Sequence, residues 1–125
     1  MNGETISDVV QFITVEEGTD LIVSFVIAGE EPDEVVSLIL LRTPVFEHIL
    51  PAEERGVRVS HESFPVEADG NLLHRITITP AVVAIETTRT RYELDVSKVD
   101  RDELQSAQRV MERMNFDQRF VVEIG

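Results

Sequence analysis

The sequence predicts an α+β fold: a mostly antiparallel sheet or open barrel of about seven to nine strands, with one C-terminal helix at about 100–115 followed by a final strand. Three observations predict this class. Val, Ile and Thr supply 37 of the 125 residues, and β-branched side chains favour strands. Apolar and polar residues alternate in several short runs, whereas one stretch near the C-terminal end has helical spacing. The length and the lack of linkers or repeats predict a single globular domain over 1–125.

The first third of the chain predicts three strands. Apolar runs at 9–15 and 20–28 are separated by a short loop that contains Gly18, which is typical of a hairpin. A third run at 34–41 is apolar on both faces of the predicted strand. Such a strand is either central in a sheet or exposed at an interface with another chain.

The middle of the chain predicts short elements. Pro44 and Pro51 bracket 45–50, which we expect to be a short strand or a strand–turn piece. Residues 51–56 begin with proline, continue with carboxylates and end with glycine, an order that indicates one helical turn. Alternation over 57–61 then predicts a half-buried strand.

A turn at 69–71 is expected to join a strand at 64–67 to a second one at 72–79. In the second strand, His74 shares a face with Leu72, Ile76 and Ile78. Between 81 and 96 the apolar face changes from odd to even positions, which requires one extra residue. We favour a β-bulge over a tight connection between two strands, because 87–90 contain no Gly, Asn or Asp.

The helix is predicted by its cap and by its apolar face. Asp100 and Glu103 have capping-box spacing, with aspartate in place of Ser or Thr, and Val99 can pack on Leu104 as a hydrophobic staple. The apolar face consists of Leu104, Ala107, Met111 and Met114. Asn115 is expected to end the helix, and alternation over 120–124 predicts the closing strand.

Charge and composition exclude several classes of protein. The chain has 24 acidic and 11 basic side chains, ten of the latter being arginine, for a net charge of −13. Scarce lysine beside abundant carboxylate is similar to the composition of proteins from a molar-salt cytoplasm, where screening weakens self-repulsion. The acidity disfavours nucleic acid as a partner. Without cysteine there is no disulfide, zinc-finger or thiol chemistry. The polar start and the lack of a long apolar run predict a cytoplasmic protein without a membrane partner.

Three equally spaced histidines form the first candidate site. His48, His61 and His74 would line up if they lie on successive antiparallel strands, and Glu62 follows the second of them. Three imidazoles and a carboxylate suit a divalent metal such as zinc, iron or manganese. The alternative is that His61 and His74 lie at the edge of the core with ordinary hydrogen-bond partners.

Three arginines form a second candidate site. Arg75, Arg89 and Arg91 lie in neighbouring strand segments, and arginine side chains match phosphate or carboxylate groups. This pattern predicts an anion site. The alternative is a ladder of ion pairs across neighbouring strands with Glu86, Glu93 and Asp95.

Catalysis is not expected, because the sequence has no nucleophile elbow, P-loop or dinucleotide fingerprint. We expect a non-enzymatic protein-interaction module adapted to high salt, which binds a protein partner or self-associates through a sheet face or edge. One alternative is a metal-binding protein or metal-dependent enzyme that uses His48, His61 and His74. A second alternative is an acidic binder of a basic protein partner, acting through the acidic first third of the chain.

Overall fold

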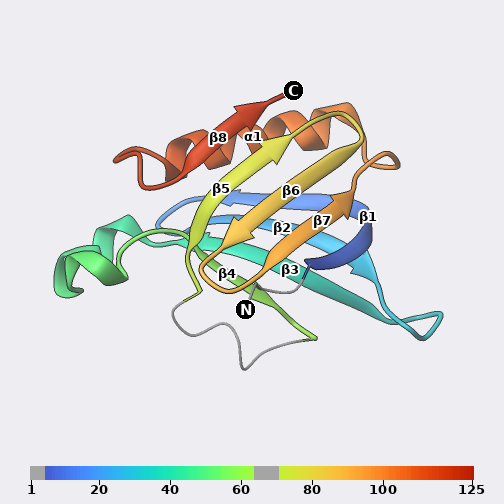
Figure 1. Cartoon of the computed structure of the whole chain (residues 1–125), viewed down its shortest axis with the longest axis horizontal. Coiled ribbons are helices and arrows are strands. Elements are labelled where there is room, and N and C mark those ends of the chain that lie inside the picture. The colour runs from blue at the N-terminus through green and yellow to red at the C-terminus, as the bar shows by residue number, and fades with distance from the viewer. Residues whose placement is uncertain (1–4, 64–70) are drawn as a thin grey trace.

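Eight strands and one α-helix make up the computed structural model, which describes residues 5–63 and 71–125 (Figure 1). The strands are β1 (Thr5–Glu17), β2 (Leu21–Ala28), β3 (Val35–Arg42), β4 (Arg58–His61), β5 (Leu73–Ile78), β6 (Val82–Thr87), β7 (Arg91–Asp95) and β8 (Val121–Ile124). They form one sheet in the order β4-β3-β2-β1-β7-β6-β5-β8. Two described pairs, β1–β7 and β5–β8, are parallel and the others are antiparallel. The predicted α+β class is confirmed.

Strand β1 holds the two halves of the sheet together. Its first part, from Thr5 to Val9, pairs with β7, and its later part pairs with β2 as far as Glu17. The register with β2 shifts between Val10 and Phe12, so the bulge falls where the strand changes partners. The sheet bends there, and Figure 1 shows β5, β6 and β7 in front of β1, β2 and β3.

The bent sheet nearly closes into a barrel on the side of β4. The Val59 amide donates to the Asn71 carbonyl at 2.9 Å, and the Leu73 amide donates to the Val57 carbonyl at 2.9 Å. An isolated antiparallel bridge between Arg58 and Leu72 lies between these two bonds. The beginning of β5 therefore meets β4, whereas the later part of β5 carries β8 on the same side.

Helix α1 (Arg101–Met114) fills the remaining open side of the barrel. Its buried face is Ala107, Val110, Met111 and Met114, which join the apolar core of the sheet. Asp100 is the N-cap residue, but its side chain makes no capping hydrogen bond. Glu103 does not complete the predicted capping box, because its carboxylate accepts the Ile13 amide of β1 at 2.8 Å. Among the described residues, no helix is long and apolar enough to cross a membrane.

Several expected elements are present. The β1–β2 hairpin, strands at 35–42 and 58–61, the helix, its end at Asn115 and the final strand agree with the sequence pattern. The doubly apolar run lies in β3, which has β2 and β4 as neighbours and is therefore internal to the sheet. The predicted strand at 64–67 lies outside the described residues, as does most of the turn at 69–71.

The segment after β3 is helical, so the expected strand at 45–50 is wrong. It forms the 3₁₀-helix η1 (Pro44–Ile49), which is followed by a second short turn, η2 (Ala52–Glu54), within the expected helical turn. Pro44 lacks the N–H that a strand ladder needs, and it suits the first turn of a helix. The helical turn directs the Glu47 carboxylate inward, where it contacts Arg42.

The change of apolar parity after Glu86 comes from a hairpin, so the favoured bulge is wrong. Strands β6 and β7 pair from Glu86 with Arg91 onward. The Thr87 hydroxyl donates to the Thr90 carbonyl at 2.9 Å and accepts the Thr90 amide at 3.0 Å. A threonine hydroxyl thus stabilises this turn in place of the usual Gly, Asn or Asp.

The bulge lies in β5 and moves His74 off the expected face. The register with β6 shifts between Leu73 and Arg75. As a result Leu73, Ile76 and Ile78 are buried, and His74 is exposed beside Arg75. Simple alternation from Leu72 fails here because the bulge adds one residue to the strand.

Candidate interaction groove

Strand β8 ends the sheet, and no described strand pairs with its outer edge. The Gly125 amide, which continues the β8 ladder, donates to the Ile78 carbonyl of β5 at 2.8 Å. Backbone groups alternate in direction along a strand, so the N–H and C=O groups of Val122 and Ile124 point away from β5. They are therefore available to a further strand.

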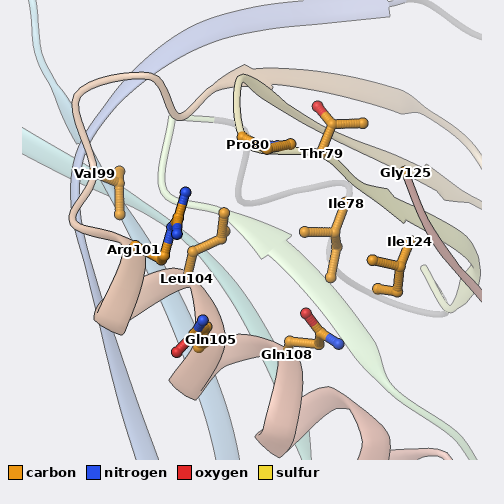
Figure 2. A pocket seen from close by; sticks show the side chains of 10 residues that line it. All are labelled: Ile78, Thr79, Pro80, Val99, Arg101, Leu104, Gln105, Gln108, Ile124 and Gly125. Atoms are coloured by element: carbon orange, nitrogen blue, oxygen red, sulfur yellow. The ribbon is translucent and has the colours of Figure 1, made fainter.

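Two hollows lie along this edge between β8 and α1. At one end is a hollow of about 390 Å³, with an apolar floor that includes Ile78, Leu104 and Ile124. Figure 2 shows Leu104 rising from α1 toward Ile78 and Ile124 across the gap. At the other end is a hollow of about 410 Å³ bordered by Glu112 of α1 and Val122 of β8. Both hollows have walls from the helix and from the strand, so we define the groove by these two hollows and the β8 edge between them.

The helix is attached on one side of the groove only. On the side of β1, Glu103 accepts the Ile13 amide, and Arg113 contacts the Glu17 carboxylate at 3.1 Å. Arg109 lies 3.8 Å from the same carboxylate. Within residues 5–63 and 71–125, no hydrogen bond or ion pair joins residues of α1 to residues of β8. The helix is thus held toward β1, which leaves the gap beside β8.

Polar side chains from α1 line the hollow near the start of the helix. They are Arg101, Gln105 and Gln108. Figure 2 shows the Arg101 side chain between Val99 and Leu104. Six of the ten arginines lie within 4.0 Å of a described carboxylate, whereas Arg101 has no partner among the described residues. Its guanidinium is therefore free to bind an anion.

A second cluster of charges is buried at the other end of the helix. Arg42 donates from Nε and Nη2 to the Glu47 carboxylate and from Nη1 and Nη2 to the Asp117 carboxylate, all at 2.8 Å. Nη1 also donates to the Met114 carbonyl at 2.7 Å. The Phe116 ring lies 4.2 Å from the guanidinium carbon. These contacts occupy all five N–H groups of the arginine.

The pKa values in this cluster show how strongly its charges are held. Burial by itself lowers the pKa of Arg42, but hydrogen bonds with Asp117 and Glu47 outweigh burial and raise the pKa above its ordinary value. The hydrogen bond from Arg42 lowers the pKa of Asp117 well below its usual range and also lowers the pKa of Glu47. All three groups stay charged near neutral pH. With no donor left for a ligand, Arg42 is a structural residue that joins β3, η1 and the end of α1.

The sequence pattern does not predict this cluster. Arg42 follows an apolar strand directly, and a charge in that position needs a partner if it is buried. Glu47 lies five residues away, but Asp117 lies 75 residues away, so its approach depends on the tertiary fold.

The three histidines contact different parts of the chain. His48 Nδ1 of η1 lies 3.1 Å from the Val45 carbonyl oxygen. The buried His61 of β4 has Nε2 at 3.2 Å from an Asp8 carboxylate oxygen, and its ring stacks with Tyr92. His61 therefore fits the alternative of a core histidine with hydrogen-bond partners.

The third histidine and the neighbouring glutamate also have protein partners. The exposed His74 has Nε2 at 3.0 Å from the Thr88 hydroxyl, and Glu62 accepts the Ser37 amide at 2.6 Å. In the part of the chain that the structure describes, no group of three or more His, Asp or Glu residues is placed to hold a metal ion. The divalent-metal site at His48, His61, His74 and Glu62 stays a prediction.

The arginines of the predicted anion site contact carboxylates. Arg75 donates to Glu123 at 2.7 Å and lies 3.9 Å from Glu86, which also pairs with Arg91 at 3.1 Å. The ion-pair alternative thus describes Arg75 and Arg91, with Glu123 as a partner that the sequence did not predict. Arg89 is exposed in the β6–β7 turn, and its side chain has no carboxylate partner among the described residues.

Comparisons with protein-family models, with curated proteins and with solved structures each found no match. What the chain does is therefore inferred from its own residues and their geometry.

Proposed function

We propose that this chain is a non-enzymatic protein-interaction module that works in a high-salt cytoplasm and binds an extended segment of a partner protein as an additional strand beside β8. One observation carries the proposal: the outer edge of β8 has no described neighbour and is bordered by the groove along α1. Addition of a strand to an exposed sheet edge is a recurrent mode of peptide binding.

The backbone and the groove have separate roles in this interaction. The N–H and C=O groups of Val122 and Ile124 would bond to the backbone of the incoming segment and supply affinity without regard to its sequence. Alternate side chains of that segment would enter the groove. From Arg101 to Glu112 the helix rises about 16 Å at 1.5 Å per residue. About five residues of an extended segment cover that length at about 3.3 Å each.

The chemistry of the groove favours binding over catalysis. Its polar walls near the start of α1 are a guanidinium and two carboxamides, from Arg101, Gln105 and Gln108. Guanidinium and carboxamide groups are not among the side chains that general acid–base catalysis commonly uses. All three can donate hydrogen bonds, and apolar side chains such as Ile78, Leu104 and Ile124 line the same hollow.

High salt suits this mode of association. Two acid-rich proteins repel each other in dilute buffer, and the Debye length falls from about 10 Å at 0.1 M to about 3 Å at 1 M salt. Backbone hydrogen bonds and apolar contacts act at shorter range than that repulsion. We therefore expect association to strengthen between about 0.2 M and 2 M KCl, whereas a complex driven by attraction to a basic partner would weaken.

A selection with displayed random peptides tests the proposal. The immobilised protein is offered the peptides in 2 M KCl, and the affinities of enriched peptides are measured for the wild type, V122P and V122T. Proline removes the outward N–H of an edge strand and keeps the bonds to β5, whereas threonine keeps that N–H. Nuclear magnetic resonance spectra check that both variants are folded.

The expected result is a set of enriched peptides that bind the wild type and V122T, with at least tenfold weaker binding to V122P. Two results would contradict the proposal. One is that no peptide is enriched above the bare support. The other is that the enriched peptides bind V122P as tightly as they bind V122T, which would place them away from the β8 edge.

A further inference from the structure

The two ends of the groove carry opposite charges. Arg101 lies at the end near the start of α1, and Glu112 lies at the end near Val122. The Glu112 carboxylate accepts a hydrogen bond from Gln108 at 3.3 Å, whereas the Arg101 guanidinium has no partner among the described residues. Its neighbours in sequence, Asp100 and Asp102, form no ion pair with it. Among the described residues neither of these two charges has an ion-pair partner, and the Arg101 guanidinium also lacks a hydrogen bond.

We propose that the groove recognises an extended protein segment that places a carboxylate side chain on Arg101, two residues from an apolar side chain that packs beside Ile124. This inference rests on strand addition at β8 and names the class of segment that is added. The ligand is an aspartate or glutamate within the strand, because Arg101 lines the hollow that the end of β8 also borders.

The spacing follows from the geometry of the two elements. A segment beside β8 presents its groove-facing side chains every second residue, about 6.6 Å apart. One such side chain lies beside Val122, and the next lies beside Ile124, over the apolar floor formed with Leu104. The third lies beyond the end of β8, in the direction of the first turn of α1, where Arg101 is. The preferred segment has apolar residues at its first and third positions and an acidic residue at its fifth, read in one of the two chain directions.

Three features favour a carboxylate at that position. The guanidinium of an arginine binds both oxygens of a carboxylate through parallel N–H donors, whereas the ammonium of a lysine lacks this paired geometry. The N-terminal end of α1 adds the positive end of the helix dipole. The nearest acidic groups, Asp100, Asp102 and Glu103, lie at the same helix end. Molar salt screens their repulsion beyond about 3 Å, while a pair in direct contact is less affected. The acidic surface of the chain is thus compatible with an acidic segment.

Four blocked, fluorescently labelled peptides test this inference by anisotropy in 2 M KCl. One is valine-threonine-valine-threonine-glutamate, the second has the reverse order, and the other two carry lysine in place of glutamate. Each is titrated with the wild type, R101E, the control R89E and the edge variant V122P. The control makes the same charge change at an exposed arginine in the β6–β7 turn, away from the groove.

We expect one glutamate peptide to bind the wild type at least fivefold more tightly than its lysine counterpart. R101E should bind the lysine peptide more tightly than the glutamate peptide. R89E should keep the preference of the wild type for glutamate. A preference for glutamate that persists in R101E would overturn the assignment of Arg101, and so would failure of all four peptides to bind the wild type.

A further outcome separates the inference from the function on which it rests. If glutamate and lysine peptides bind the wild type equally and V122P weakens both, the charge preference is wrong and strand addition stands. If V122P weakens neither, strand addition at β8 is wrong as well.

Discussion

Replacing Arg42 with methionine tests how far the fold depends on its buried ion cluster. Methionine has a similar length and no charge, so the variant keeps most of the packing beneath Phe116 and removes every hydrogen bond of the guanidinium. The carboxylates of Glu47 and Asp117 lose their shared cation, and the Met114 carbonyl loses a donor.

The expected cost is large for one side chain. Removing one partner of a buried ion pair costs about 3–5 kcal/mol. The Asp117 side chain retains 31% of its exposure and can be solvated by water, whereas that of Glu47 retains 12%. We therefore expect R42M to lower the free energy of unfolding by about 3 kcal/mol, near the lower limit of that range. The total free energy of unfolding of a typical domain is about 5–15 kcal/mol.

The effect should depend on pH in a defined direction. The pKa values of Asp117 and Glu47 are lowered in the folded protein, first of all by hydrogen bonds from Arg42. Their contribution to stability is present in full above the unfolded carboxyl pKa values of about 4, and it is lost as the pH falls through the folded values. The difference between wild type and R42M should therefore narrow between about pH 7 and pH 3.

Urea unfolding in 2 M KCl, followed by circular dichroism, measures this difference. R89M serves as the control, because its exposed arginine has no described carboxylate partner, and it should change the free energy of unfolding by less than about 0.5 kcal/mol. The cluster does not stabilise the fold as argued if the free energy of unfolding of R42M lies within about 1 kcal/mol of that of the wild type at pH 7 and the difference is the same at pH 3.

Three further perturbations test other parts of the structure. The thermal midpoint should rise between 0.2 M and 2 M KCl as screening relieves the charge of −13, and a fall would argue against salt adaptation. E103A leaves the Ile13 amide without its acceptor; it should cost about 1–3 kcal/mol and speed hydrogen exchange at that amide, and unchanged exchange would contradict the contact. T87A removes the hydroxyl that bonds to both backbone groups of Thr90; it should cost about 1 kcal/mol in urea unfolding, whereas a neutral result would show that the turn needs no side chain.

The sequence predicts those elements whose causes lie within about a dozen residues. The helix ends at Asn115, and the β1–β2 hairpin turns at Gly18 because glycine and asparagine adopt turn conformations readily. The bulge in β5 was not predicted, because the residues around His74 also fit a regular strand in which every second side chain is buried. Thr87 was not recognised as a turn residue, since its role depends on a hydroxyl that finds the Thr90 backbone.

The groove and the buried cluster depend on contacts that are distant in sequence. Glu103 has the spacing of a capping box, but it contacts Ile13, 90 residues away, because the far part of β1 lacks a strand on that side. Arg101 stays without a partner because the fold places no described carboxylate beside it. An open strand edge likewise becomes visible only when the order of all strands is known.

The two pairings of β1 have a consequence for the order in which the chain folds. Its later part can pair with β2 as soon as the hairpin at 18–20 forms, but Thr5–Val9 must wait for β7, which begins at Arg91. Closing a loop of this size delays native contact and slows folding. During synthesis, the first residues of β1 are thus an unpaired edge until most of the chain has been made, and the abundant early carboxylates supply the repulsion that keeps such edges apart.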